Sequence, residues 1–262
     1  MPSATAVPPA AASLSLSRVA HDYQVEGRAI PALLPVDLTI APGEFVSIIG
    51  PSGCGKSTLL RIAGGLLAPS AGTVRAGDRS PHELQRSGQV GFVFQDPSLL
   101  PWRTVASNIR LVQEISRAHR RAVDVDRLLR LVGLAGYRDY YPHQLSGGMK
   151  QRVALARSLA LQPTLLLMDE PFGALDEITR AQLRDELLAL RERFNATVLF
   201  VTHSIAEAIL LSDRVVVMSG SPGRLALTLP IDLPRIRSAD LEEQPHFQQL
   251  ARQLRFALRG GI

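Results

Sequence analysis

The first part of the chain alternates between hydrophobic and polar positions, the spacing of strands that bury one face. Residues 1–13 precede this pattern and are rich in Ala, Pro, Ser and Thr, so we expect a flexible tail there. The alternating apolar positions are Leu14, Leu16, Val36, Leu38 and Ile40. Pro42-Gly43 then supplies a turn, and we predict an antiparallel β layer before it.

Continuous apolar runs follow, and these are typical of buried strands when turn residues or helical patterns bound them. The runs lie at residues 45–49, 90–94, 165–168 and 197–201. Between residues 105 and 134 the apolar spacing changes to i, i+3, i+4, i+7, which predicts helices, and Leu183, Leu187, Leu190 and Phe194 repeat that spacing. We therefore predict an α/β fold with a helical subdomain inserted at about residues 97–157.

The last third of the chain carries signals for a closing hairpin and one further helix. Residues 214–218 and 225–229 are apolar runs that Ser221-Pro-Gly-Arg224 separates, a pattern typical of a hairpin. Phe247, Leu250, Leu254 and Leu258 have amphipathic spacing. We expect residues 14–230 to form the main domain and residues 231–262 a C-terminal helical extension packed on its side.

Composition narrows the class of protein. The chain has 262 residues, 46% of them hydrophobic and 20% charged, which suits one globular domain with an insertion. No apolar run approaches the roughly 18 residues of a membrane span. A start without a basic signal region and a lone cysteine, Cys54, favour the cytoplasm. The net charge of +5 suits an anionic partner, but Arg is scattered along the chain, so we expect no nucleic-acid partner.

A glycine-rich segment directly after residues 45–49 fits G-x-x-x-x-G-K-[ST]. It consists of Gly50, Pro51, Ser52, Gly53, Cys54, Gly55, Lys56, Ser57 and Thr58. Triphosphate oxygens need bare backbone N–H groups, and Gly53 and Gly55 let the backbone wrap that closely. We expect Lys56 to reach the β- and γ-phosphates and Ser57 to bind Mg²⁺. The alternative, a glycine-rich turn with a chance lysine, is disfavoured by the strand before it and the helix pattern after it.

Polar side chains follow three of the other predicted strands. Asp169 and Glu170 are adjacent and therefore point opposite ways, so one can support Mg²⁺ while the other takes a proton from the attacking water. Gln95 and His203 also end strands, and ligands bind at the carboxyl edge of such sheets. We expect Gln95 to reach Mg²⁺ or water and His203 to reach the γ-phosphate, although a lone strand-end histidine is often a core residue.

Two further segments and one tyrosine each allow two interpretations of their role. Ser146-Gly147-Gly148 precedes a strong helix pattern, which indicates a second anion site or an ordinary capped helix. Tyr23 ends the first strand, where its ring can stack on a nucleobase or lie half-buried in the sheet. The apolar loop at residues 99–105 holds the only tryptophan and either packs on its own domain or forms an exposed partner site.

Taken together in their order, these motifs resemble those of the ATPase subunit of ABC transporters. The resemblance covers roughly residues 14–230 and rests most specifically on Leu145-Ser-Gly-Gly-Met149 upstream of a strand that ends in Asp-Glu. It implies a P-loop NTPase core of the RecA-like type. Residues 99–105 with Asn108, and residues 221–224, narrow the resemblance to the nitrate, sulfonate and taurine importer ATPases.

The resemblance implies a head-to-tail homodimer in which Ser146, Gly147 and Gly148 of one copy close over ATP held by the other. It further implies adenine stacking by Tyr23, Mg²⁺ support by Asp169 and a general base in Glu170. His203 would contact the γ-phosphate, and Asp176 would line the dimer seam. The ATPase would sit peripherally on the cytoplasmic face of the cell membrane, where it drives two permease subunits fed by an extracytoplasmic solute-binding protein.

Two rival classes fit less well. A soluble ABC ATPase of DNA repair or translation would carry a coiled-coil insertion or a second cassette, and this chain shows one signature and no long heptad run. A P-loop GTPase or small-molecule kinase would leave the Ser-Gly-Gly segment unexplained, and no Asn-Lys-x-Asp motif occurs. We therefore expect an importer ATPase.

Overall fold

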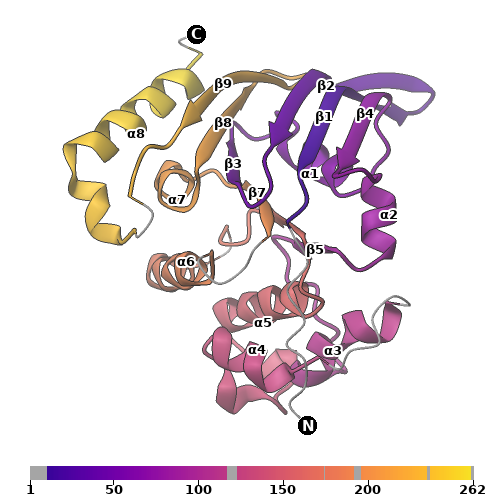
Figure 1. The fold of residues 1–262 in the computed structure, drawn as a ribbon, viewed down its shortest axis with the longest axis vertical. Coiled ribbons are helices and arrows are strands. Elements are labelled where there is room, and N and C mark those ends of the chain that lie inside the picture. The colour runs from indigo at the N-terminus through magenta and orange to yellow at the C-terminus, as the bar shows by residue number, and fades with distance from the viewer. Residues whose placement is uncertain (1–10, 117–122, 174, 192–195, 235–236, 261–262) are drawn as a thin grey trace.

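The computed structural model describes residues 11–116, 123–173, 175–191, 196–234 and 237–260 (Figure 1). Its centre is a six-stranded sheet in the order β5-β6-β7-β3-β8-β9, parallel except for the β9 edge. The strands are β3 Phe45–Ile49, β5 Val90–Val93, β6 Leu165–Asp169, β7 Thr197–Val201, β8 Arg214–Ser219 and β9 Arg224–Pro230. Every residue of β3, β6 and β7 is buried, as the continuous apolar runs predict. The α/β fold is confirmed.

A second sheet of three antiparallel strands lies beside the first, in the order β2-β1-β4. Its strands are β1 Leu14–Val25, β2 Arg28–Ile40 and β4 Ala71–Ala76. The antiparallel layer is as predicted, but β4 and the following helix α2 (Pro81–Arg86) are additions. Most of the predicted tail, residues 1–10, lies outside the described residues. Ala12 hydrogen bonds to Thr164 and Thr197 next to the first strand.

The faces of the central sheet are covered by separate hydrophobic clusters. In β3, Phe45 packs with the inserted helices, Val46 and Ile48 pack with α1 (Lys56–Ala63) and the antiparallel sheet, and Ile49 packs with α7 (Ile205–Leu211). Because successive strand residues point to opposite faces, Phe45 and Ile49 lie on one face and Val46 and Ile48 on the other. This short strand thus contributes to all three clusters. Helix α6 (Glu177–Arg191) packs on the same face of the central sheet as the inserted helices and belongs to the same hydrophobic cluster. The predicted helix position Phe194 lies outside the described residues.

The inserted helices form the lower part of the molecule in Figure 1. They are α3 Val105–Ile115, α4 Val125–Leu131 and α5 Gly147–Leu159, with short 3₁₀ turns at Ala135–Tyr137 and Pro142–Gln144. Side chains cap the starts of these helices: Thr104 accepts from the Ser107 N–H, Asp124 from Arg127 and Ser146 from Met149.

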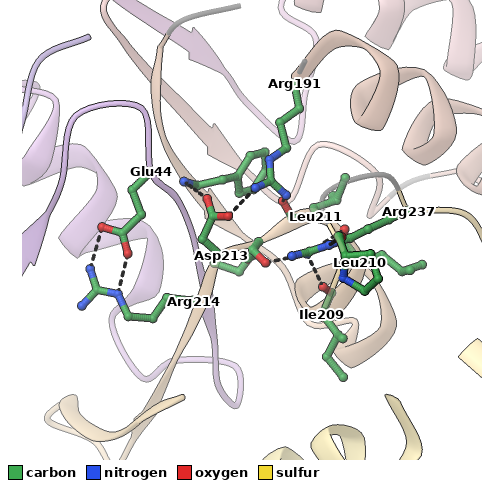
Figure 2. Close-up of polar contacts among 12 residues, drawn as sticks. Glu44, Arg191, Ile209, Leu210, Leu211, Asp213, Arg214 and Arg237 are labelled. Carbon is green, nitrogen blue, oxygen red and sulfur yellow. Dashed lines mark hydrogen bonds and ion pairs between the residues drawn. The ribbon is translucent and has the colours of Figure 1, made fainter. Parts of the chain in front are cut away.

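The C-terminal extension packs against the core through η3 (Ala239–Glu243) and α8 (Pro245–Leu258), whose apolar face lies on α7 and β8. Figure 2 shows how Arg237 ties this extension to α7, because its Nη1 donates to the carbonyls of Ile209 at 2.9 Å and Leu210 at 3.2 Å. Burial and the nearby Arg191 lower the pKa of Arg237 to about 10. The extension therefore caps the C-terminal end of α7.

Candidate functional site

The glycine-rich turn joins the end of β3 to the start of α1. Gly53 and Gly55 have φ angles of 81° and 86°, in the left-handed region that glycine adopts without penalty. A Cβ on Gly55 would lie 2.5 Å from Leu33 Cδ2, and one on Gly50 would lie 2.6 Å from the Met218 carbonyl oxygen. Strands β2 and β8 thus enclose the turn on its outer side. The N–H groups at the start of α1 are left for an anion.

Lys56 is buried at this turn and holds its ammonium group against backbone carbonyls. Its Nζ donates to the carbonyl oxygens of Gly50 at 2.9 Å and Pro51 at 3.0 Å. The nearest carboxylate is Glu170, whose Oε1 lies 4.0 Å from Nζ. Carbonyl groups satisfy the ammonium hydrogens without neutralising the charge, so the buried cation favours the arrival of an anion.

Ser57 and Asp169 face each other between α1 and the end of β6. Ser57 Oγ donates to Asp169 Oδ1 at 2.8 Å. Burial raises the pKa of the Asp169 carboxyl above its usual range, and the hydrogen bond from Ser57 lowers it in part. Hydroxyl and carboxylate oxygens are the ligand types that Mg²⁺ prefers. The Ser57 hydroxyl and the Asp169 carboxylate therefore offer two ligands of the type that this ion prefers. Within the described ranges, no group of three or more His, Cys, Asp or Glu lies close enough together to hold a metal ion.

Glu170 has a φ of 45°, which is rare for a residue with a side chain and costs free energy. The conformation is held at the sheet edge because the Glu170 N–H donates to the carbonyl of Val201 at 2.9 Å. Its Oε2 lies 3.4 Å from Nδ1 of His203, which follows β7. A strained carboxylate between a buried lysine and a histidine is typical of a functional site.

Gln95 lies in the same region. A Cβ on Gly173 would be 3.4 Å from Gln95 Nε2 and 3.6 Å from Glu170 Oε2, so both side chains border Gly173. The structure thus brings together the groups that the sequence predicted at the sheet edge. These are Lys56, Ser57, Asp169, Glu170, Gln95 and His203.

Helix α5 holds the loop that carries Gln95, a feature that sequence reasoning missed. The buried Gln151 donates through Nε2 to the Phe94 carbonyl at 2.9 Å. Arg157 donates to the carbonyl of Pro97 at 2.6 Å. Gln151 and Arg157 bond to carbonyl groups about 60 residues away in the chain, so the sequence around them holds no local signal for these contacts.

A second missed group supports the His203 loop. The Thr202 hydroxyl donates to Glu207, and the Ser204 N–H donates to Thr202 Oγ1 at 3.0 Å. Burial raises the pKa of Glu207. The Ser204-x-x-Glu207 spacing is that of a capping box, and it was the available signal for a helix start directly after His203.

Tyr23 lies on β1 next to the first turn of α1. Its hydroxyl and Oγ1 of Thr58 are 3.1 Å apart and share a hydrogen bond, and the His21 ring packs edge-on against its ring at 4.7 Å. The Tyr23 side chain is 38% exposed. Tyr23 is therefore partly accessible beside the glycine-rich turn, which keeps the stacking interpretation open.

The Ser-Gly-Gly segment forms the start of α5. Ser146 caps the helix and is exposed together with Gly147, whereas Gly148 is buried. Asp176 caps α6 by accepting from the Thr179 N–H at 3.0 Å, and this hydrogen bond lowers the pKa of its carboxyl. In Figure 1 helix α5, which begins with the Ser-Gly-Gly segment, belongs to the lower helical part, whereas α1 belongs to the upper part. The structure therefore does not bring it to the glycine-rich turn of the same chain.

A parallel sheet with this turn and this carboxylate edge defines a P-loop ATPase. A model described as ABC transporter matches residues 33–173, more than half of the chain, and the chain belongs to this family. It is 49% identical over 214 residues to the aliphatic sulfonates import ATP-binding protein SsuB 1 of Xanthomonas axonopodis pv. citri, covering 80% of this chain and 84% of that protein. It is 45% identical over 226 residues to the nitrate import ATP-binding protein NrtD of Synechococcus elongatus, and the match covers 84% of this chain and 81% of that protein.

Solved structures agree with this assignment. The dimer of MJ0796, described as a bacterial ABC transporter cassette, has a TM-score of 0.72 and 35% identity, and covers 84% of this chain and 100% of that chain. The same cassette in a post-hydrolysis state bound to ADP and Pi gives a TM-score of 0.73 and 34% identity, with the same coverage. The predicted ATPase of importer type is confirmed, and the DNA repair or translation alternative is not supported. The chain binds and hydrolyses ATP.

Within the described residues, no helix is both long and apolar enough to cross a membrane.

Proposed function

We propose that this chain works as a head-to-tail pair that energises uptake of a small solute such as nitrate, a sulfonate or taurine. The observation that carries the proposal is the division of the site. The P-loop and the carboxylate edge lie around α1, β6 and β7, whereas Ser146 and Gly147 are exposed at the start of α5 in the other part of the chain (Figure 1). Two antiparallel copies complete two sites, and a single copy completes none.

ATP is held by the segment from Gly50 to Thr58. Backbone N–H groups and the positive end of α1 bind the phosphate oxygens, and Lys56 neutralises the β- and γ-phosphates. The buried position of the ammonium supports this role, because its carbonyl partners leave the charge free to pair with an anion. The partly exposed Tyr23 stacks on adenine.

Hydrolysis depends on the two adjacent carboxylates in different roles. Ser57 and Asp169 hold Mg²⁺, which when bound neutralises developing charge on the phosphoryl oxygens. Glu170 accepts the proton of the attacking water at its carboxylate, and the 3.4 Å contact to Nδ1 of His203 supports its orientation. His203 reaches the γ-phosphate, and Gln95 borders the same space beside Gly173 and reaches water or Mg²⁺.

The partner copy supplies the second half of each site. Ser146, Gly147 and Gly148 close over the triphosphate, and Asp176 lines the seam between the copies. The exposed helix start at Ser146 supports this role, because its N–H groups and positive end suit an anion. Closure needs ATP, and hydrolysis and release reopen the pair.

Each of two permease subunits docks on one copy of the chain, at a groove between the inserted helices and the core. The groove has a volume of about 620 Å³ and is lined by Phe92, Phe94 and Ile115, among others. Beside the same inserted helices, Trp102 is 70% exposed, which favours a partner site over packing on its own domain. Buried Asn108 holds this loop, because its Nδ2 donates to the Leu100 and Arg103 carbonyls.

The proposal places the pair on the cytoplasmic face of the cell membrane, with an extracytoplasmic solute-binding protein delivering the solute. The test is co-purification of the chain with its permease from native membranes, followed by reconstitution in proteoliposomes. We expect ATP-dependent uptake of labelled nitrate, taurine or an alkanesulfonate, stimulated by the binding protein. ATPase activity stimulated by DNA or ribosomes, without permease in the purified complex, would overturn the proposal.

A further inference from the structure

Gly223 lies in the turn between β8 and β9, in the segment Ser221-Pro-Gly-Arg224 to which the mechanism assigns nothing. Two backbone hydrogen bonds fasten it to β2, because its N–H donates to the Ala32 carbonyl and its carbonyl accepts from the Leu34 N–H, both at 2.9 Å. The hairpin is therefore joined to the strand whose Leu33 packs against Gly55.

The same glycine lies directly against the P-loop backbone. A Cβ on Gly223 would lie 2.0 Å from the Cys54 carbonyl oxygen and 2.9 Å from the Cys54 carbonyl carbon. The oxygen is the nearer atom, so the carbonyl points at Gly223. Gly223 has an ordinary φ, and the position therefore requires glycine for space rather than for backbone conformation. Backbone atoms cannot move aside by rotating a side chain.

The direction of this carbonyl determines the direction of the next N–H. In a planar trans peptide the carbonyl and the following N–H point opposite ways. The Gly55 N–H therefore points away from Gly223, and it donates to no acceptor within the described residues. It is one of the N–H groups at the start of α1, where an anion binds.

We propose that Gly223 is a positioning residue for phosphate binding: by lacking a side chain it admits the Cys54 carbonyl and so turns the Gly55 N–H toward the bound phosphates. This inference rests on the proposed role of the P-loop. Adding a Cβ would push the Cys54 carbonyl away and rotate the peptide, which removes one charge-assisted hydrogen bond to phosphate. The β8–β9 turn thereby acts on nucleotide affinity from 169 residues along the chain (223 against 54).

The test compares Gly223→Ala with Gly136→Ala, a matched control at an exposed glycine of ordinary φ where a Cβ would meet nothing within 4 Å. We expect Gly223→Ala to weaken binding of ATP and ADP by about tenfold or more in calorimetry, the loss of one hydrogen bond to a charged group. Its kcat at saturating ATP should stay within about threefold of wild type, since only binding is weakened. The control should bind as wild type does.

A merely structural role would lower thermal stability without nucleotide and leave the affinity of the folded fraction unchanged, and that result would overturn the inference. If Gly223→Ala does not fold, amide hydrogen exchange on the wild-type chain decides. Binding of ADP should slow exchange at the Gly223 N–H along with the P-loop, and an unchanged rate at Gly223 would reject the contact as a positioning device. Failure of the wild-type chain to bind ADP would instead contradict the proposed function.

Discussion

Gly148 and Thr179 bring α5 and α6 into direct contact, because a Cβ on Gly148 would lie 2.3 Å from Thr179 Cγ2. Gly148 belongs to the segment proposed to close over the partner's ATP, yet its Cβ position faces its own chain. A side chain added at residue 148 therefore disturbs the packing of α5 against α6 in its own copy before it can affect the contact with the partner copy. Exposed Gly147, where the nearest contact of an added Cβ is Leu175 Cδ2 at 3.8 Å, has room for a side chain.

Gly148→Ala should lower the free energy of unfolding by about 1–3 kcal/mol, the usual cost of overpacking a tight contact. Thr179→Ser removes the methyl group nearest to the added Cβ and keeps the hydroxyl. The double variant should therefore recover most of the stability in urea unfolding. A double variant no more stable than Gly148→Ala would show that the strain lies elsewhere.

Gly147→Asp should leave folding and nucleotide binding by the single copy intact and abolish cooperative ATP hydrolysis. The added carboxylate would face the partner's triphosphate, and like charges repel at close range. Gly147→Asn is the matched control of equal size without the charge. The measurement is ATPase rate against ATP concentration, and equal rates for the two variants would rule out an electrostatic cause.

Glu170→Gln should retain ATP binding and lose hydrolysis, because an amide cannot accept the proton of the attacking water. Loss of a general base typically costs about 10²–10⁴-fold in rate. The variant should accumulate as an ATP-bound dimer in size-exclusion chromatography. Glu186→Gln, which alters a carboxylate paired with Arg152 instead, serves as the control. Near-normal turnover of Glu170→Gln would reject its assigned role.

Lys56→Ala should act earlier, on ATP binding itself. The ammonium neutralises phosphate charge in the bound ground state as well as in the transition state, so its loss weakens both. Loss of a hydrogen bond to a charged group corresponds to roughly a tenfold or greater drop in affinity. Calorimetry with ATP checks this, and equal affinities for variant and wild type would contradict it.

Trp102→Ala should fold and hydrolyse ATP as an isolated subunit but fail to co-purify with the permease. The side chain is largely exposed, so its loss removes little packing, whereas a tryptophan at an interface centre can contribute on the order of 2 kcal/mol or more. Phe256→Ala is the matched control, an aromatic residue 63% exposed on α8. Retained assembly and uptake by Trp102→Ala would locate the docking site elsewhere.

Much of the core was predictable because its signals are local. The apolar runs of β3, β6 and β7 and the glycine-rich turn after β3 are properties of short segments. Placing Asp169, Gln95 and His203 at one sheet edge needed only the rule that parallel strands end together. The predicted helical region between residues 105 and 134 became α3 and α4, with residues 117–122 outside the described ranges.

Strand β4 was not predicted, and the reason is physical. Five of the six β4 residues are not buried, so the strand lacks the apolar alternation that marks a half-buried sheet and forms because its backbone pairs with β1. Pairing of this kind depends on a distant partner and leaves no mark within the segment itself.

The sequence alone determined the chemistry of the P-loop, the order of the motifs and the family. Tertiary structure alone decided that Gly148 faces Thr179, that Gln151 holds the loop of Gln95, and that Gly223 abuts Cys54. Local patterns follow from the periodicity of helices and strands, which each segment carries by itself. Contacts between segments far apart in the chain depend on how the whole core packs, and their distances follow only from the folded backbone.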